Sequence, residues 1–200
     1  MKIGIYSGTF DPIHNGHLDF AKTAAKQLGL DRVYLLVEPT PRRKQGVKAF
    51  EHRAQMVKLA VKNIKTLGSI ILEQPTFSVE DTLPILLERF RGSELFMLLG
   101  EDVLGHLVDW PHVDHLLVSV SFIIGARDGA KNDVLSSVKI LEQTRGISIK
   151  YEIVEGNFPN ISSSKIRLSL RRGEQPSEVP KVVLNYAKNH KLYSDQLASA

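Results

Sequence analysis

Two histidines lie three residues apart in a ten-residue stretch near the start of the chain, Gly8-Thr9-Phe10-Asp11-Pro12-Ile13-His14-Asn15-Gly16-His17. The apolar run before it, residues 3–6, is typical of a buried strand, and residues 17–28 after it show a helical pattern. A strand, a glycine-containing turn and a helix N-terminus together favour the binding of a phosphate chain. The two imidazole rings add hydrogen-bond donors, and Gly16 allows a large ligand to approach the backbone.

A simpler interpretation is a strand-to-helix turn whose histidines only cap the helix and pack. We favour phosphate binding because His14 and His17 both fall in the first strand-to-helix turn, beside Gly8 and Thr9. The whole string resembles the (T/S)-x-F-D-P-x-H-x-G-H signature of the adenylyltransferases. They form a branch of the nucleotidyltransferase superfamily that shares H-x-G-H with class I aminoacyl-tRNA synthetases.

Composition places the chain among ordinary globular proteins. Its 200 residues suit one domain, and 42% are hydrophobic while 24% are charged. Because the chain has no cysteine, it has no disulfide or thiolate site. We see no signal peptide or membrane-length apolar run, so we expect a cytoplasmic protein without a membrane partner. The net charge of +4 favours anionic ligands but is too small to indicate nucleic acid.

Apolar runs alternate with helical patterns along most of the chain. The expected strands are residues 2–6, 33–37, 69–73, 94–99, 118–125 and 147–154. The expected helices are residues 17–28, 50–64, 79–90, 102–106, 133–144, 162–171 and 179–189. Repeated strand–helix units predict an α/β fold, a Rossmann-like doubly wound parallel sheet with a small C-terminal helical element. We expect a single domain over residues 1–193, a helical element at 162–193 and a frayed tail at 194–200.

A proline-rich basic loop, residues 38–46, follows the second expected strand. It is either a solvated loop or a mobile phosphate clamp, and it resembles the proline-rich loop that ends in lysine in the adenylyltransferases. Lys44 falls at that lysine, whereas Arg43 replaces a histidine found in many members. Arg53 and Met56 match the R-x-x-M of the next helix in that family.

Two later segments carry candidate residues for a second ligand. Residues 76–83 resemble the S-Y-T-x-D-T-L region that holds the pyridine end of the substrate in nicotinate-nucleotide adenylyltransferases, with one extra residue between Ser78 and Asp81. Ser78 is equally well explained as a helix N-cap. Gly100, Asp102 and Trp110 resemble the family's G-x-D-x-x-x-x-L-x-x-W. Asp102 could accept ribose hydroxyls and Trp110 could stack on a pyridine ring, although a helix cap and a core tryptophan are the simpler alternatives.

Three serines and an arginine near the C-terminus form the last motif. Residues 161–167, Ile-Ser-Ser-Ser-Lys-Ile-Arg, resemble the family's I-S-S-T-x-I-R. Hydroxyls at a helix start cap N–H groups or bind phosphate, and Ser163 shares a helix face with Arg167. Arg127 stands where the family has R-P-G, with Asp128 in place of the proline. The end of the chain also matches, at Tyr186 and Leu192-Tyr193.

Five further polar residues cluster near the tryptophan, namely His106, Asp109, His112, Asp114 and His115. Their spacing matches no established ligand set, and Pro111 interrupts a helix there. We therefore expect no protein-held metal site.

The matches cover residues 2–193 and most resemble the nicotinate (nicotinamide) mononucleotide adenylyltransferase family. The resemblance implies transfer of AMP from ATP to a pyridine mononucleotide, with Mg²⁺ accompanying ATP and a homo-oligomer as a possible assembly. The implied catalytic residues are His14, His17 and Lys44. The implied ATP-binding residues are Gly8, Thr9, Phe10, His14, Gly16, His17, Ser162, Ser163, Ser164 and Arg167. The implied mononucleotide-binding residues are Lys44, Ser78, Thr82, Gly100, Asp102, Trp110 and Arg127.

Two alternatives stay open. One is a sister enzyme, a pantetheine-phosphate adenylyltransferase or a cytidylyltransferase, although these are usually shorter and lack the segment that contains Trp110. The other is a non-catalytic nucleotide-binding or regulatory module, although intact His14, His17 and Arg167 argue against it. Fold analogy alone does not decide function.

Overall fold

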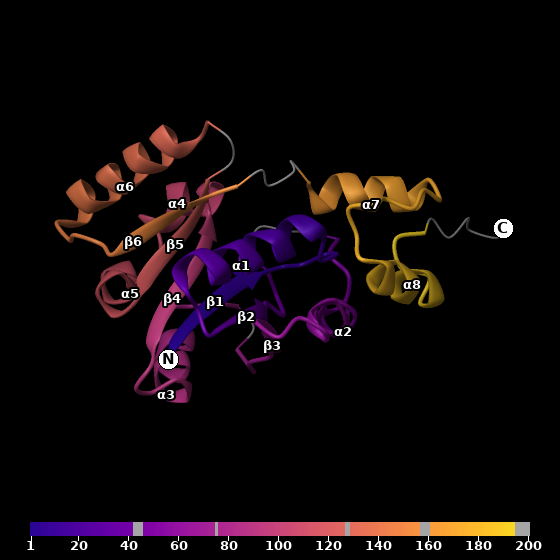
Figure 1. Ribbon diagram of the computed structural model, residues 1–200, viewed down its shortest axis with the longest axis horizontal. Helices are drawn as coiled ribbons and strands as arrows, with labels where there is room; N and C mark the ends of the chain where they lie inside the picture. Colours follow the sequence, from indigo (N-terminus) through magenta and orange to yellow (C-terminus); the bar gives the residue numbers. More distant parts are fainter. Residues whose placement is uncertain (42–45, 75, 127–128, 157–160, 195–200) are drawn as a thin grey trace.

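The computed structural model describes residues 1–41, 46–74, 76–126, 129–156 and 161–194. In these residues six strands form one parallel sheet, in the order β3-β2-β1-β4-β5-β6 (Figure 1). The strands are β1 (Lys2–Gly8), β2 (Arg32–Val37), β3 (Leu67–Ile70), β4 (Glu94–Gly100), β5 (Ser121–Ala126) and β6 (Tyr151–Glu155). Successive strands run outward from β1 in one direction and from β4 in the other. This order confirms the predicted doubly wound α/β fold and places a ligand crevice between the ends of β1 and β4.

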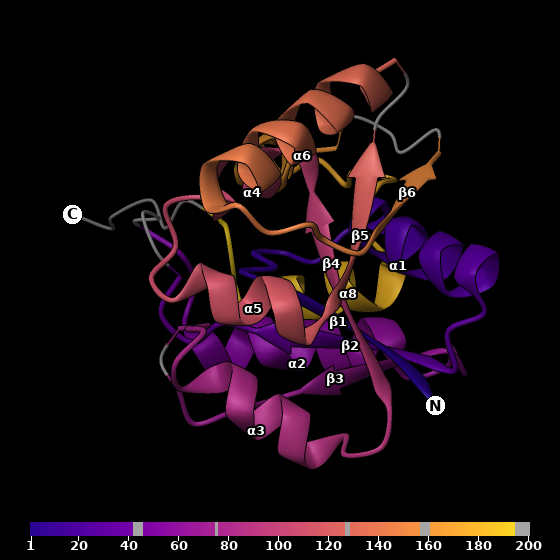
Figure 2. The ribbon, with the colours of Figure 1, turned by 90° about the vertical axis from the view of Figure 1, so that its left-hand side faces the viewer.

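Helices cover both faces of the sheet. They are α1 (Asn15–Leu28), α2 (Phe50–Val61), α3 (Thr82–Arg89), α4 (Glu101–Leu107), α5 (Val113–Ser119), α6 (Lys131–Arg145), α7 (Ser163–Arg171) and α8 (Lys181–Asn189). Figure 2 shows α3, α4 and α5 to the left of the strands and α1 to the right.

Two hydrophobic cores lie on the opposite faces because side chains alternate along each strand. In β4, Phe96 and Leu98 join the core under α1 and α2, whereas Met97 and Leu99 join the core under α3 to α6. The strands are therefore buried on both sides, as expected of a parallel sheet.

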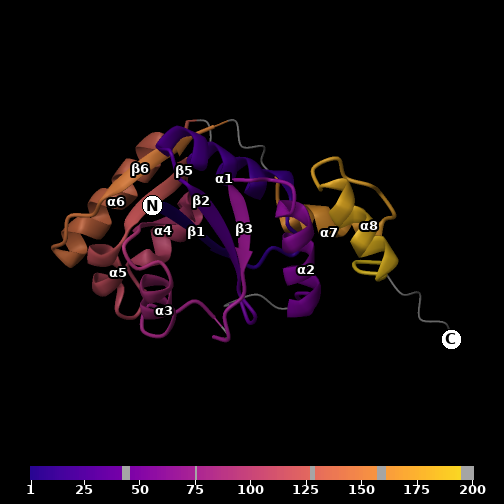
Figure 3. The same ribbon diagram turned by 60° about the horizontal axis from the view of Figure 1, so that its bottom comes forward.

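The C-terminal helix α8 lies beside α2 (Figure 3). Val183 and Ala187 of α8 belong to the same core as Met56 and Val57 of α2. The helical element is thus joined to the sheet by a shared core, and it brings the start of α7 towards the crevice.

Several predicted element boundaries were wrong. Helix α5 was not predicted, and residues 118–119 were assigned to a strand, because one apolar run continues from α5 into β5 across a single residue. The third strand ends at Ile70 rather than residue 73, and Ile71 is exposed. Helix α3 begins at Thr82 rather than residue 79, because residues 79–81 form a turn.

Candidate active site

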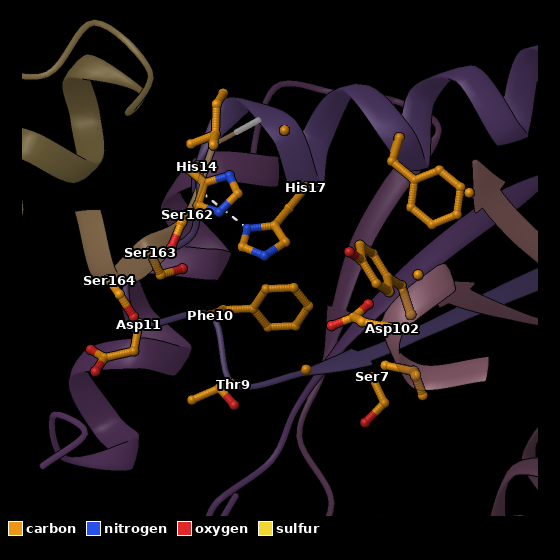
Figure 4. Close-up of a pocket in the computed structure, with 18 of the residues that line it drawn as sticks. Ser7, Thr9, Phe10, Asp11, His14, His17, Asp102, Ser162, Ser163 and Ser164 are labelled. Atoms are coloured by element: carbon orange, nitrogen blue, oxygen red, sulfur yellow. Dashed lines mark hydrogen bonds between the residues drawn. The ribbon is translucent and has the colours of Figure 1, made fainter. Parts of the chain in front are cut away.

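A cavity of about 490 Å³ opens at the C-terminal ends of β1 and β4. It brings together twelve of the residues proposed from the sequence, Gly8, Thr9, Phe10, His14, Gly16, His17, Gly100, Asp102, Ser162, Ser163, Ser164 and Arg167. Figure 4 shows the serines on the same side as His14, and Asp102 on the other side of the Phe10 ring. One end of the cavity therefore has the hydroxyls of Ser162–Ser164, with Arg167 beside the Asp11 carboxylate, and the other end has Asp102.

The two histidine rings lie against each other. Their centroids are 3.6 Å apart with an interplanar angle of 23°, and Phe10 meets the His17 ring edge-on at 5.0 Å. The backbone N–H of His14 donates to Nδ1 of His17 at 3.3 Å. Because Nδ1 accepts this bond, a neutral His17 ring carries its proton on Nε2. Such a ring can donate Nε2–H to a ligand oxygen.

His14 is the N-cap residue of α1 and is 5% exposed. Burial lowers the pKa of His14 to about 4, so the ring is neutral at pH 7. A Cβ at residue 16 would lie 3.2 Å from this ring, so Gly16 makes room for His14. From the sequence, we expected Gly16 to let a ligand approach the backbone. In the structure, the group closest to a Cβ at this position is the His14 side chain.

The start of α7 is fastened to the loop that contains the histidines. The Ser163 hydroxyl donates to the carbonyl of Pro12 at 3.1 Å, and Arg167 Nη1 donates to the carbonyl of Asp11 at 2.7 Å. Arg167 Nη2 also donates to Ser164 Oγ at 3.1 Å. Segments about 150 residues apart in sequence are thereby held together at one end of the cavity.

Asp102 marks the opposite end of the cavity, where α4 begins after β4. A Cβ at residue 100 would lie 2.5 Å from Asp102 Oδ1, so this position requires glycine while the carboxylate keeps its place. Tyr6 and Ser7 of β1 also line the cavity and were not proposed from the sequence. Burial, and secondarily the Asp102 carboxylate, raise the pKa of Tyr6. Ser7 Oγ donates to Glu38 Oε1 at 2.8 Å.

A buried arginine connects the loops after β1 and β2. Arg53 donates to the carbonyls of Thr9, Glu38, Pro39 and Lys48, at 2.7–2.8 Å. Its side chain is fully buried, and burial lowers its pKa while nearby carboxylates, chiefly Asp11, oppose the shift. The R-x-x-M match singled out Arg53, but the motif alone does not predict that its guanidinium bonds the carbonyls of two loops.

Among the described residues, three other proposed mononucleotide residues, Ser78, Thr82 and Trp110, do not line this cavity. Ser78 and Asp81 bond each other, since Ser78 Oγ donates to Asp81 Oδ2 and accepts the Asp81 N–H. Asp81, not Ser78, is the N-cap of α3. Thr82 is buried, and its Oγ1 accepts the Ser78 N–H at 3.0 Å. Trp110 is half-buried and packs against Phe77, with ring centroids 5.9 Å apart.

Two proposed residues, Lys44 and Arg127, lie outside the described residues, as do Arg43, Asp128 and positions 195–200 of the expected tail. Within the described ranges, no three His, Cys, Asp or Glu side chains are grouped so that they could hold a metal ion. In the same part of the chain, no helix has the length and apolar character needed to cross a bilayer.

Comparisons with known proteins agree on one family. The model of the cytidylyltransferase-like family matches residues 5–169. A relative from Bacillus pumilus (strain SAFR-032), named "Probable nicotinate-nucleotide adenylyltransferase", is 31% identical over 96% of this chain and 98% of its own. The nicotinate-nucleotide adenylyltransferase of Bacillus subtilis (strain 168) is 29% identical over the same shares of the two chains.

A solved structure has the same fold. The nicotinic acid mononucleotide adenylyltransferase of Plasmodium falciparum, complexed with NaAD, superimposes with a TM-score of 0.78 at 21% identity, over 96% of this chain and 97% of the other. The family-model match and the near full-length relatives show that this chain belongs to the nicotinate-nucleotide adenylyltransferase family of the cytidylyltransferase-like proteins.

Proposed function

We propose that the chain transfers AMP from ATP to nicotinate mononucleotide, giving deamido-NAD and pyrophosphate. The observation that carries the proposal is the single cavity at the β1–β4 switch point. It has two histidines, three serines and Arg167 at one end and Asp102 at the other. Hydroxyls, imidazole and guanidinium suit a triphosphate, while a carboxylate suits ribose hydroxyls. The names of the relatives support this assignment of substrates.

The reaction requires alignment and charge neutralisation more than acid–base chemistry. A phosphate oxygen of the mononucleotide attacks the α-phosphorus of ATP, and the bond to the bridging oxygen breaks to release pyrophosphate. The attacking phosphate is already an anion at pH 7, so no general base or covalent intermediate is needed. Charge stabilisation by fixed donors then supplies most of the acceleration.

The histidines would divide this work. His17, with its proton on Nε2, would donate to a non-bridging oxygen of the α-phosphate, where charge develops. His14 is neutral because of its burial, so it would act as a hydrogen-bonding group for the outer phosphates rather than as a cation. Ser163, Ser164 and Arg167 would hold the β and γ phosphates with it.

At the other end, Asp102 would accept the ribose hydroxyls of the mononucleotide. Thr9 and Lys44 would position the two reacting phosphates. Trp110, Ser78 and Thr82 would contact the pyridine end, and Arg127 is a further candidate in this group. Lys44 and Arg127 lie outside the described ranges, and Ser78, Thr82 and Trp110 lie outside the cavity, so the roles of these five residues rest on the family resemblance.

We also propose that Mg²⁺ enters with ATP. The phosphate end of the cavity offers hydroxyl oxygens at Thr9 and the three serines, which are hard donors that Mg²⁺ accepts. When bound, the ion would neutralise charge on the phosphate oxygens, with phosphate and water as most of its ligands.

Pyrophosphate release tests the proposal. The protein is incubated with ATP, Mg²⁺ and, separately, nicotinate mononucleotide, its amide and phosphopantetheine, or with CTP and a phosphorylated acceptor. We expect release with ATP and a pyridine mononucleotide, and formation of a dinucleotide product. Release only with phosphopantetheine or CTP would identify a sister enzyme, and ATP binding without any release would identify a non-catalytic module.

A further inference from the structure

The Asp11 carboxylate joins four segments of the chain beside the cavity. It is 2% exposed, and its Oδ1 accepts the Tyr193 hydroxyl at 2.5 Å across 182 residues of sequence. Its Oδ2 accepts the backbone N–H of Lys48 at 3.2 Å and lies 3.9 Å from Arg167 Nη1. Tyr193 is also 2% exposed. A buried carboxylate needs such partners, because an uncompensated charge there is costly.

The two oxygens of the Asp11 carboxylate have different partners, which lie at different distances. At 3.9 Å, Oδ2 attracts the guanidinium of Arg167 but is beyond hydrogen-bond length. The Tyr193 hydroxyl and the Lys48 N–H hold the carboxylate in this place from the other sides. Burial and the Asp11 charge raise the pKa of Tyr193, so its hydroxyl stays protonated and keeps donating.

Among the described residues, this arrangement leaves most of the guanidinium for a ligand. Within those residues two of its N–H donors are used, by the Asp11 carbonyl and by Ser164, and a guanidinium has five. A direct bidentate bond to the Asp11 carboxylate would consume two more and neutralise the charge that a phosphate needs. Asp11 and Arg167 both line the cavity, whereas Tyr193 does not, so Tyr193 acts on the ligand through these two residues.

We propose that Tyr193 and Asp11 are positioning residues for ATP: Tyr193 holds the Asp11 carboxylate back, and Asp11 thereby presents the Arg167 guanidinium to the β and γ phosphates. The C-terminal end of the chain would in this way set the affinity for ATP. The inference rests on the proposed function, because it assumes that ATP phosphates occupy this end of the cavity.

Tyr193→Phe removes one hydroxyl and keeps the ring. We expect the dissociation constant for ATP, measured by calorimetry, and the KM for ATP to rise about five- to tenfold, which is within the range for the net contribution of one ordinary hydrogen bond. The KM for the mononucleotide should change less than about twofold. Tyr186→Phe is the matched control. It removes the hydroxyl that pairs with His52 Nδ1 at 3.0 Å and also fastens the C-terminal element to α2, but it does not contact Asp11.

A double-mutant cycle separates positioning from general loosening of the fold. Arg167→Ala and Tyr193→Phe are measured singly and together for ATP affinity, below the melting temperature of every variant. If Tyr193 acts through Arg167, its five- to tenfold effect disappears in the Arg167→Ala background. The same factor in both backgrounds, or equal losses in Tyr193→Phe and Tyr186→Phe, would overturn the inference alone. A wild-type protein that binds no ATP would overturn the proposed function and the inference with it.

Discussion

The phosphate end of the cavity and the segment proposed to bind the pyridine end of the substrate are built in different ways. At the phosphate end, hydrogen bonds join residues far apart in sequence, as in the pairs Ser163–Pro12, Arg167–Asp11 and Tyr193–Asp11. The residues proposed for the pyridine end bond mainly within their own turn, as Ser78 does with Asp81 and Thr82. The phosphate end therefore has its geometry fixed before any ligand arrives. Single changes there should have large effects, and changes at the pyridine end should have small ones.

The largest expected effect comes from Arg53, which connects the loops behind both ends. Arg53→Met leaves four backbone carbonyls without their guanidinium donor in a buried place. We expect the free energy of unfolding to fall by about 3–5 kcal/mol, as for loss of one partner in a buried charged network. Urea unfolding monitored by circular dichroism measures this change.

Arg91→Met provides the control for Arg53. Arg91 makes an exposed ion pair with Glu88, so its loss should cost less than about 1 kcal/mol. Similar costs for the two variants would show that the Arg53 bonds do not hold the loops.

His17→Ala tests the phosphate end directly. Removal of a donor to developing charge should lower kcat by roughly 10²–10³-fold or more, while the circular dichroism spectrum stays unchanged. His115→Ala, at an exposed position on α5, should retain wild-type kcat. Near-normal turnover by His17→Ala would remove the histidine from the proposed chemistry.

Features that depend on neighbouring residues were predicted from the sequence more completely than features that depend on distant contacts. The β1–α1 turn was predicted because strand, glycine and helix pattern adjoin one another in the chain. Helix α5 was missed because residues 116–124 form a mostly apolar run in which helix and strand are separated only by Val120. The predicted third strand was too long at its C-terminal end. Ile71 is apolar and follows Ile70, so the sequence does not indicate that Ile71 is exposed and outside the strand.

The motifs in the sequence identified residues that line the cavity, but they did not predict the hydrogen bonds between those residues and the rest of the chain. The serines, Arg167 and the histidines were grouped by resemblance, and the structure places them around one cavity. Nothing in the sequence links Asp11 to Tyr193, because a contact across 182 residues depends on how α7 and α8 return to the β1 loop. The wrong N-cap at Ser78 has a local cause, since Ser78 and Asp81 do bond each other but in a turn that precedes the helix.

The buried His14 predicts a pH dependence of stability. Its pKa is about 4 in the folded protein and near 6.5 when unfolded, so the unfolded state binds the proton first as pH falls. Stability should therefore decline between about pH 6.5 and pH 4, by about 3 kcal/mol in total from this group.

A variant isolates this contribution from the other titrating groups. His14→Gln lacks it, so the gap in unfolding free energy between wild type and variant should change by that amount between pH 7 and pH 4. A constant gap would mean that the pKa of His14 is not lowered by burial.

Among the substitutions in this Discussion, the smallest effect is expected at the pyridine end, where Trp110 is the test. Trp110→Ala should reduce kcat/KM about tenfold for nicotinate mononucleotide and for its amide, because loss of a stacking ring costs both to a similar degree. Wild type should prefer the acid, since a helix N-terminus favours a carboxylate. That preference should survive in Trp110→Ala, because a flat apolar face does not distinguish the two groups. Tyr34→Ala, which removes a half-buried ring packed on Phe90, controls for loss of core packing.

The expected acid preference requires the turn at residues 78–82 to change its hydrogen bonds. The N–H groups of Ser78, Asp81 and Thr82 are already bonded within the turn, and the Asp81 carboxylate lies beside them. Equal efficiencies for acid and amide would show that this turn does not open to read the ligand. An acid preference that disappears in Trp110→Ala would show that the ring, rather than the turn, positions the carboxylate, and the contrast between the two ends would then be smaller than the hydrogen bonds suggest.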